Sequence, residues 1–282
     1  MRNVHGVVAG AALLLSTLSS ARANLLVANF NDVNPGALGG QAGGSGFTGT
    51  WSGSAQGNIV ANDLTSSLYS VPQSGTAQHL HNTTNQLRQN YRTAATAVTG
   101  TVWFSFLAAA EGTGDNAGLS FNPPTASPFN DPGTAYAYIS GNSLVYRFGA
   151  ASSASVSAPA VGTTSLIVGQ ITIVGGGGND TVKLWLNPDL VANPDINTYT
   201  PVYSSNSFNA LDSIASIGAI ASAAGTGSIG GDVDNIRISD GGGNSTTAYQ
   251  DVTGVPEPAG LGLVGLAATG LLRRSRRARL AP

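Results

Sequence analysis

Frequent glycine is the feature that most limits what this chain can fold into. The 282 residues include 38 glycines, and only 9% of all residues are charged. The glycines separate short apolar runs that are rich in Thr, Ser and Ala, a mixture typical of strands and turns. Hydrophobic residues still make up 41% of the chain, so a sizeable core can form and disorder is not expected.

The short apolar runs predict an all-β protein. The run TVWFSFLAAA at 101–110 is almost continuously apolar, as in a strand buried on both faces, and Gly141 and Asn142 suit a hairpin turn. The segment 214–224 fits a strand or a short helix, and the Gly-rich segment before Trp51 suits a long loop. Other strands are expected at 25–30, 117–121, 135–140, 144–149, 165–174, 181–186 and 232–239. These short elements favour two antiparallel sheets packed as a β-sandwich.

Charge is distributed unevenly along the chain. Between Asp32 and Asp251 there are thirteen carboxylates but only five basic side chains, which gives this region a formal charge of about −8. Nucleic-acid affinity comes largely from Lys and Arg that neutralise phosphates, so nucleic acid is not an expected partner. The chain has no cysteine, which excludes disulfides, thiolate metal sites and cysteine nucleophiles.

The N-terminus has the three parts of a secretory signal peptide. Arg2 supplies a positive charge, residues 7–18 are apolar, and Ala21-Arg22-Ala23 forms an A-x-A cleavage site. We therefore expect residues 1–23 to be removed on export. A short membrane anchor is the alternative, but the apolar run is shorter than the roughly 20 residues of a span.

The C-terminus, residues 255–282, also has three parts. Val255-Pro256-Glu257-Pro258 cannot continue a strand or enter a helix interior, because each proline lacks an N–H and has a fixed φ. A fourteen-residue apolar segment, 259–272, follows and suits a short transmembrane helix. Five arginines then suit a cytoplasmic membrane stop: Arg273, Arg274, Arg276, Arg277 and Arg279.

This order of parts resembles the PEP-CTERM sorting signal of Gram-negative bacteria. The resemblance implies that exosortase, a membrane protease-transpeptidase, recognises residues 255–258 while the short helix holds the chain transiently in the inner membrane. It also implies a division into an exported domain at 24–240, a Gly/Ser/Thr-rich linker at 241–254 and the sorting signal at 255–282. An ordinary C-terminal anchor preceded by a proline turn is the alternative.

The exported domain resembles the concanavalin A-like lectin/glucanase jelly roll by its pattern of strands. The resembling stretches are LLVANF, TVWFSFLAA, VKLWLNP and VDNIRIS. The resemblance implies a lectin-like sandwich, and an immunoglobulin-like or galactose-binding-like sandwich is the alternative.

Catalytic groups for glycan cleavage are not recognisable in the sequence. Glycosidases normally use two carboxylates at a set separation. Glu111 is the only glutamate between the two terminal signals, and EGTGDN does not fit the E-x-D-x-x-E motif of glucanases. His79 and His81 have no accompanying G-x-S-x-G motif. We therefore expect a non-enzymatic protein.

Two polar segments are candidates for metal binding. His79 and His81 alternate with Leu80 and would share one face of a strand, where they either bind a metal or form a solvated face. Asp232, Asp234 and Asn235 offer oxygen ligands for Ca²⁺ as a cofactor, or else form an outward polar face with Asn235 in a bulge.

Tryptophans are candidates for carbohydrate binding. Trp185 is on the mixed face of its strand and Trp51 adjoins a Gly-rich loop, so both suit a sugar-binding surface, whereas Trp103 suits the core. Taken together, the sequence predicts a non-catalytic, exported protein of the cell envelope or extracellular matrix, associated with exopolysaccharide. A carbohydrate-binding module is the alternative, and a polysaccharide-degrading enzyme is the third interpretation.

Overall fold

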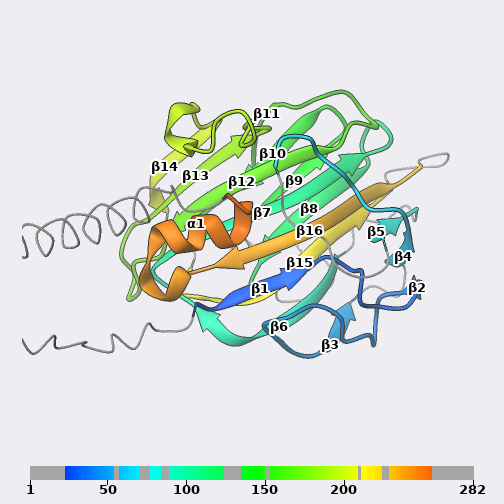
Figure 1. Cartoon of the computed structure of the whole chain (residues 1–282), viewed down its shortest axis with the longest axis horizontal. Coiled ribbons are helices and arrows are strands. Elements are labelled where there is room, and N and C mark those ends of the chain that lie inside the picture. Colours follow the sequence, from blue (N-terminus) through cyan, green and yellow to red (C-terminus); the bar gives the residue numbers. More distant parts are fainter. Residues whose placement is uncertain are drawn as a thin grey trace, which may run out of the picture.

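A computed structural model describes residues 23–53, 57–69, 77–83, 89–123, 135–149, 153–208, 211–223 and 229–255. These residues form a sandwich of two antiparallel sheets (Figure 1). The predicted fold class, an all-β sandwich, is therefore confirmed. Most of the expected signal peptide, the arginine cluster and residues 256–258 lie outside the described residues, and so does the expected C-terminal membrane helix. Within the described residues, no helix is long and apolar enough to cross a membrane.

Nine described strands form the first sheet, sheet A, and seven form the second, sheet B. Sheet A runs in the order β14 (Tyr203–Phe208), β13 (Asp180–Leu186), β12 (Ser165–Thr172), β7 (Thr101–Ala110), β16 (Gly231–Ser239), β5 (Gln78–Asn82), β4 (Asn58–Ala61) and β2 (Gly36–Ala37), and β1 (Leu25–Ala28) also pairs with β16. Sheet B runs in the order β11 (Ala154–Ser157), β10 (Ser143–Arg147), β9 (Ala135–Ser140), β8 (Asn116–Phe121), β15 (Ile214–Ser222), β6 (Gln89–Val98) and β3 (Phe47–Gly53).

The main core lies between the two sheets. Each strand contributes alternate side chains to it, because successive side chains point to opposite faces of a sheet. Phe104 and Phe106 of β7 point into it and are fully buried. A side chain on Gly169, which pairs with Phe104, would put its Cβ 2.1 Å from the Phe104 ring, so glycine is required there. This close approach places the aromatic ring over the backbone of β12.

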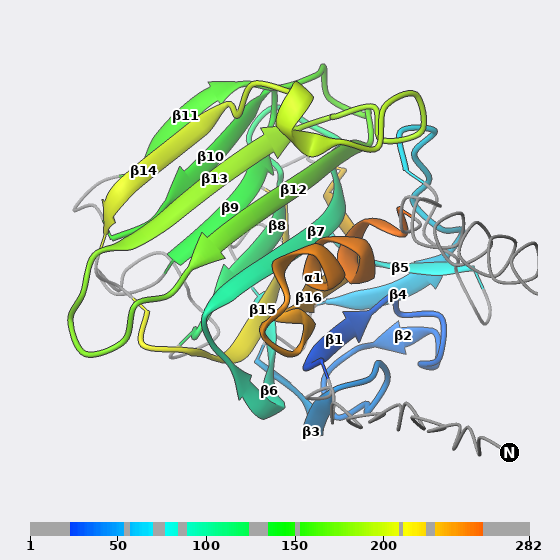
Figure 2. The ribbon, with the colours of Figure 1, turned by 60° about the vertical axis from the view of Figure 1, so that its left-hand side comes forward.

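The outer face of sheet A carries a second apolar cluster. Trp103 and Leu107 of β7 point to this side, opposite to Phe104 and Phe106. Helix α1 (Ser245–Thr253) covers them with Ala248 and Val252 (Figures 1 and 2). β7 is therefore buried on both faces, as its continuous apolar run predicts.

Helix α1 occupies the segment that we expected to be a linker, 241–254. It begins after Asn244, whose side chain accepts hydrogen bonds from the N–H groups of Thr246 and Thr247, and it ends at Gly254 with φ of 68°. The 3₁₀ helix η3 (Gly241–Gly243) precedes it. The folded unit therefore extends to Val255, because two apolar side chains and good caps hold an otherwise polar helix against the sheet.

Each predicted strand agrees with a described one to within two residues at each end, whereas β6, β11 and β14 were not predicted from the sequence. The segment 214–224, left open between strand and helix, contains strand β15. The Gly-rich loop before Trp51 contains β2 and the start of β3. The predicted strand at 165–174 is shorter, and β12 ends at Thr172. The hairpin turn at Gly141 and Asn142 is confirmed between β9 and β10.

The two ends of the described chain meet at β16. Leu25 of β1 pairs with Ser239, and the main-chain N–H and side-chain amide of Asn24 donate hydrogen bonds to the Asp240 carboxylate at 2.9 and 2.7 Å. On the other side of β16, the pairing with β7 shifts between Asp234 and Arg237, and Asn235 has φ of 53°. The bulge expected at Asn235 is confirmed.

Candidate functional site

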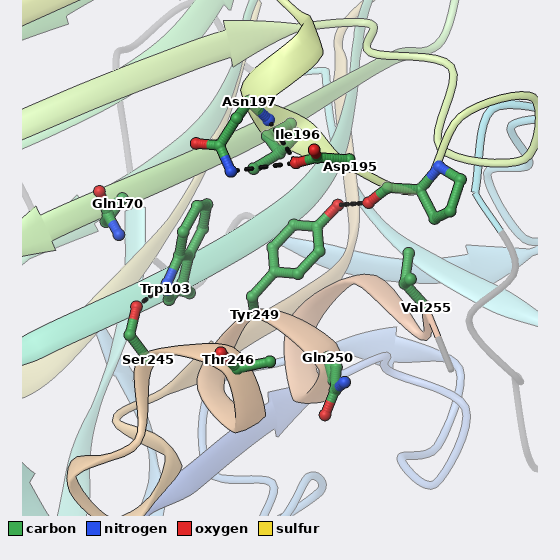
Figure 3. Close-up of a pocket in the computed structure, with 11 residues that line it drawn as sticks. Trp103, Gln170, Asp195, Ile196, Asn197, Ser245, Thr246, Tyr249, Gln250 and Val255 are labelled. Atoms are coloured by element: carbon green, nitrogen blue, oxygen red, sulfur yellow. Dashed lines mark hydrogen bonds between the residues drawn. The ribbon is translucent and has the colours of Figure 1, made fainter. Parts of the chain in front are cut away.

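A pocket of about 510 Å³ lies on the outer face of sheet A. Its floor is β7 and β12, and α1 and the loop 187–199 form facing walls (Figure 3). The lining residues are Trp103, Gln170, Pro194, Asp195, Ile196, Asn197, Ser245, Thr246, Tyr249, Gln250 and Val255.

The loop wall is built from two Asn-Pro-Asp segments, at 187–189 and 193–195. Asn187, with φ of 51°, accepts a hydrogen bond from the Leu166 N–H at 2.7 Å. Asp195 caps the 3₁₀ helix η2 (Ile196–Thr198) by accepting from the Asn197 N–H at 3.0 Å. The expectation of a structured loop here is confirmed, and these internal bonds hold Asp195 and Asn197 at the pocket edge.

The floor of the pocket is aromatic. The Trp103 ring meets Tyr249 edge to face, with centroids 4.9 Å apart, and stacks on Trp185 at 5.7 Å. The Trp103 Nε1–H donates to the Ser245 hydroxyl at 2.9 Å, and the Tyr249 hydroxyl donates to the Pro194 carbonyl at 2.7 Å (Figure 3). These bonds tie α1 to both the sheet and the loop, so the pocket is formed in advance.

The polar groups of the pocket are mostly uncharged. Gln170, Asn197 and Gln250 carry amides, and Asp195 carries the one carboxylate among the lining residues. Burial raises the pKa of Tyr249 to about 12, so its hydroxyl stays protonated at neutral pH. Aromatic rings beside amides and hydroxyls provide both an apolar face and several hydrogen-bonding groups, which suits a neutral polar ring better than a highly charged ligand.

Trp51 and Trp185, the expected sugar-binding surface, are both buried. Trp51 is 1% exposed and packs against Phe30 and Phe47, because its side chain belongs to the main core between the sheets. Trp185 is 3% exposed beneath Trp103, and its Nε1–H donates to the Tyr199 carbonyl at 3.0 Å. The expectation of exposed stacking surfaces was therefore wrong for both; α1 and the 187–199 loop cover Trp185 on the mixed face of β13, whereas Trp51 lies in the main core.

The candidate metal ligands of the two polar segments come together on the same outer face of sheet A. His81 of β5 pairs directly with Asp232 of β16. The Asp232 Oδ1 lies 2.5 Å from His81 Nδ1 and 3.2 Å from His79 Nε2. We call these three residues the His–Asp cluster. The sequence indicated the two histidines and Asp232 as separate candidates, but it did not predict that they contact each other.

Asp234, two residues further on, has different partners. It accepts hydrogen bonds from the main-chain N–H groups of Leu64, at 3.2 Å, and Asn235, at 2.6 Å. Its side chain is fully buried, and burial raises its pKa well above the ordinary value. Asp232 instead contacts the imidazoles of His79 and His81. These contacts do not test the calcium site at Asp232, Asp234 and Asn235, which remains a prediction.

Within the His–Asp cluster, the carboxylate stabilises the charged form of each imidazole, and the imidazoles stabilise the charged form of the carboxylate. Burial opposes the charged form of His79, but hydrogen bonds to Asp232 and to the Asn62 carbonyl, with the nearby negative charge, raise its pKa. The hydrogen bond to Asp232 raises the pKa of His81 against burial. Burial disfavours the Asp232 carboxylate, but both histidines lower its pKa overall.

Glu111 follows β7 close to this cluster. Burial, and then the negative charge of Asp232, raise the pKa of its carboxyl. Its Oε2 is shielded from water and accepts no hydrogen bond from the described residues. The only glutamate between the terminal signals therefore lies beside the histidines, a position that could not be predicted from the sequence.

Val255, the first residue of the expected sorting motif, lies at the edge of the pocket (Figure 3). It follows the left-handed cap Gly254 directly. The other motif residues, Pro256, Glu257 and Pro258, lie outside the described residues, and so do Arg273, Arg274, Arg276, Arg277 and Arg279.

The pocket residues Gln170, Asp195, Asn197 and Tyr249 were not identified from the sequence. The paired Asn-Pro-Asp segments were the available signal, because they mark a loop with fixed side chains. Nothing in the sequence indicated that α1 would face this loop.

Comparison with known proteins gives no family for this chain. No family model matches the sequence, and no curated protein matches it. Among solved structures, an alginate lyase has a TM-score of 0.45 at 11% identity, over 76% of this chain and 96% of the lyase. A peanut lectin has a TM-score of 0.40 at 10% identity, over 76% of this chain and 97% of the lectin.

A third solved structure, the carbohydrate-binding module CBM66 from Bacillus subtilis, has a TM-score of 0.30 at 11% identity. That match covers 64% of this chain and 92% of the module. With TM-scores below 0.5, these similarities are partial and assign neither a family nor a ligand to this chain.

Proposed function

We propose that this chain is an exported cell-envelope protein whose lectin-like sandwich binds a glycan in the pocket beside α1 and does not cleave it. The observation that carries the proposal is the preformed pocket itself. Tyr249 provides a partly exposed aromatic ring that packs on the buried Trp103, and Gln170 and Asn197 provide amides at the edge of the pocket. Sugars present the matching combination of an apolar ring face and several hydroxyls.

Glycan binding is tested by calorimetry of the full chain, in mild detergent, against a panel of neutral and acidic bacterial exopolysaccharides. We expect Gln170→Ala and Asn197→Ala each to weaken binding about 3- to 10-fold, because one net hydrogen bond contributes about 0.5–1.5 kcal/mol. The exposed Asp212 offers a control, since Asp212→Asn lies outside the pocket. Equal affinities in all four proteins, or no binding to any member of the panel, would contradict the proposal.

The non-catalytic part of the proposal has its own measurement. The lining carboxylate, Asp195, is engaged in capping η2 and has no second carboxylate among the lining residues to form a catalytic pair. We expect no new reducing ends and no unsaturated uronate when the bound glycan is incubated with the protein. Product release that depends on Asp195 would replace this proposal with an enzymatic one.

The sorting role is a second part of the proposal and rests on the terminal sequence. The resemblance to the PEP-CTERM signal implies export, transient anchoring in the inner membrane and processing by exosortase near 255–258. One structural fact supports it: the folded unit runs to Val255, so the motif directly follows the last packed helix. The pocket would then lie beside the attachment point of the processed protein.

Sorting is tested by expressing the chain in a host with and without its exosortase and measuring the intact mass of the product. We expect loss of the C-terminal segment only when exosortase is present, and loss of this processing in Pro256→Ala with Pro258→Ala. A product that retains residues 273–282 in both hosts would exclude the sorting role and leave the glycan pocket untouched.

A further inference from the structure

The His–Asp cluster has the composition and spacing of a metal site. Two neutral imidazoles and one carboxylate are the ligands that Zn²⁺ and related divalent transition metals prefer. The three donor atoms all lie within 4.8 Å of one another. They come from β5 and β16, which pair directly at His81 and Asp232, so the backbone ladder fixes their separation.

Ligand distances decide whether a metal fits. A tetrahedral zinc ion with ligands at about 2.0–2.2 Å holds any two donor atoms about 3.4 Å apart. His79 Nε2 and Asp232 Oδ1 are already 3.2 Å apart. His81 Nδ1 and Asp232 Oδ1, at 2.5 Å, have to separate by about 1 Å when an ion binds between them.

The second ring nitrogen of His79 is held as in known metal-binding histidines. Its Nδ1 faces the main-chain carbonyl of Asn62, and because a carbonyl cannot donate, Nδ1 must carry the hydrogen. Nε2 is then the nitrogen presented to Asp232. A histidine that binds a metal through one nitrogen commonly donates its other N–H to a carbonyl or carboxylate, which fixes the tautomer.

The backbone also leaves room for the second imidazole. Gly230 has φ of 133°, and a Cβ at this position would lie 2.7 Å from Cε1 of His81. The side chains of His79 and His81 remain 12% and 18% exposed, whereas Asp232 is 6% exposed. An ion from solvent can therefore reach the imidazoles, and a water molecule can complete its coordination.

We propose that His79, His81 and Asp232 form a binding site for a divalent transition metal of the zinc class. Glu111, whose buried Oε2 has no hydrogen-bond partner within the described residues, interacts with Asp232, and a bound dication would stabilise both carboxylates in their charged form. Calcium is disfavoured, because it takes six to eight oxygen ligands and this site supplies two nitrogens. None of the three ligands lines the glycan pocket. The proposed metal site can therefore be correct or wrong independently of the proposed function.

The test uses the full chain in mild detergent, purified without a polyhistidine tag, stripped with EDTA and titrated with ZnCl₂ by calorimetry. We expect one equivalent to bind and the melting temperature to rise with zinc concentration. His79→Asn, His81→Asn and Asp232→Asn should each weaken binding at least 10- to 100-fold, as even outer-shell changes do in metalloproteins. Asp212→Asn, the same exchange on an exposed loop, should bind as the unmodified chain does.

Cobalt gives a reading that does not depend on how the variants fold. Co²⁺ added to the unmodified chain should produce visible d–d absorption of a four- or five-coordinate site, which one equivalent of Zn²⁺ abolishes. Failure to bind zinc stoichiometrically, with no cobalt absorption, would show that the His–Asp cluster is only an ion pair and would overturn the proposal. Binding that persists in all three ligand variants would overturn it equally.

Discussion

The pocket beside α1 and the His–Asp cluster share the outer face of sheet A but are held together differently. The pocket walls are a nine-residue helix and an irregular loop, joined by side-chain bonds such as that from Tyr249 to the Pro194 carbonyl. The His–Asp cluster is held by two strands whose main chains pair at His81 and Asp232. Changes to α1 should therefore damage the pocket and leave the metal ligands in place.

The largest expected effect comes from removing the aromatic floor of the pocket. Trp103→Ala should cost about 3–5 kcal/mol of unfolding free energy, because the 5% exposed ring contacts Trp185 and Tyr249 on the two sides. Urea denaturation measures the loss, and Trp103→Phe, which keeps an aromatic ring, should lose less. Glycan binding should disappear. Loss of zinc binding in the folded variant would show that the two sites are not independent.

A smaller effect should follow from removing the cap of α1. Asn244→Ala leaves the N–H groups of Thr246 and Thr247 without their side-chain acceptor and should cost about 1 kcal/mol. Asn244→Asp keeps an acceptor and is the matched control. We expect severalfold weaker glycan binding with unchanged zinc binding. Unchanged glycan affinity would mean that the position of α1 does not determine the shape of the pocket.

The smallest effect is a pH-dependent one in the His–Asp cluster, measured in EDTA. The raised pKa values of His79 and His81 give stability that is present below pH 6.5 and lost as pH rises through the folded values. The lowered pKa of Asp232 gives stability that is present above pH 3.8 and lost as pH falls through its folded value. Asp232→Asn should therefore destabilise most between pH 3.8 and 6.5, by about 1 kcal/mol or less. A difference from the unmodified chain that is constant from pH 4 to 9 would contradict this assignment.

The two sites also show how far a sequence can predict such a molecule. The strand at 101–110 follows from a continuous apolar run, and the shared face of His79 and His81 follows from alternation; both are local properties of the sequence. The contact between His81 and Asp232 joins positions 151 residues apart, and local patterns carry no information about which strands pair.

The pocket was harder to predict for a different reason. Helix α1 contributes only Ala248 and Val252 to the buried cluster, so its sequence, STTAYQDVT, suggests a linker. The mixed face of β13 suggested that Trp185 was available to ligands. Alternation within β13 does not identify the helix α1 and the 187–199 loop, which cover Trp185. The burial of Trp185 could therefore not be predicted from the sequence of its own strand.

The bond between Asn24 and Asp240 has a mechanical consequence. The first described strand, β1, pairs with the last one, β16, and α1 follows β16 closely, so the chain enters the folded unit beside the strand that leads into α1. Tension applied at Val255 is transmitted through the helix into β16, whose ladders with β1 and β7 resist it by shear. A molecule held at its C-terminus would thus bear its load on β16, which pairs with β7, β1 and β5.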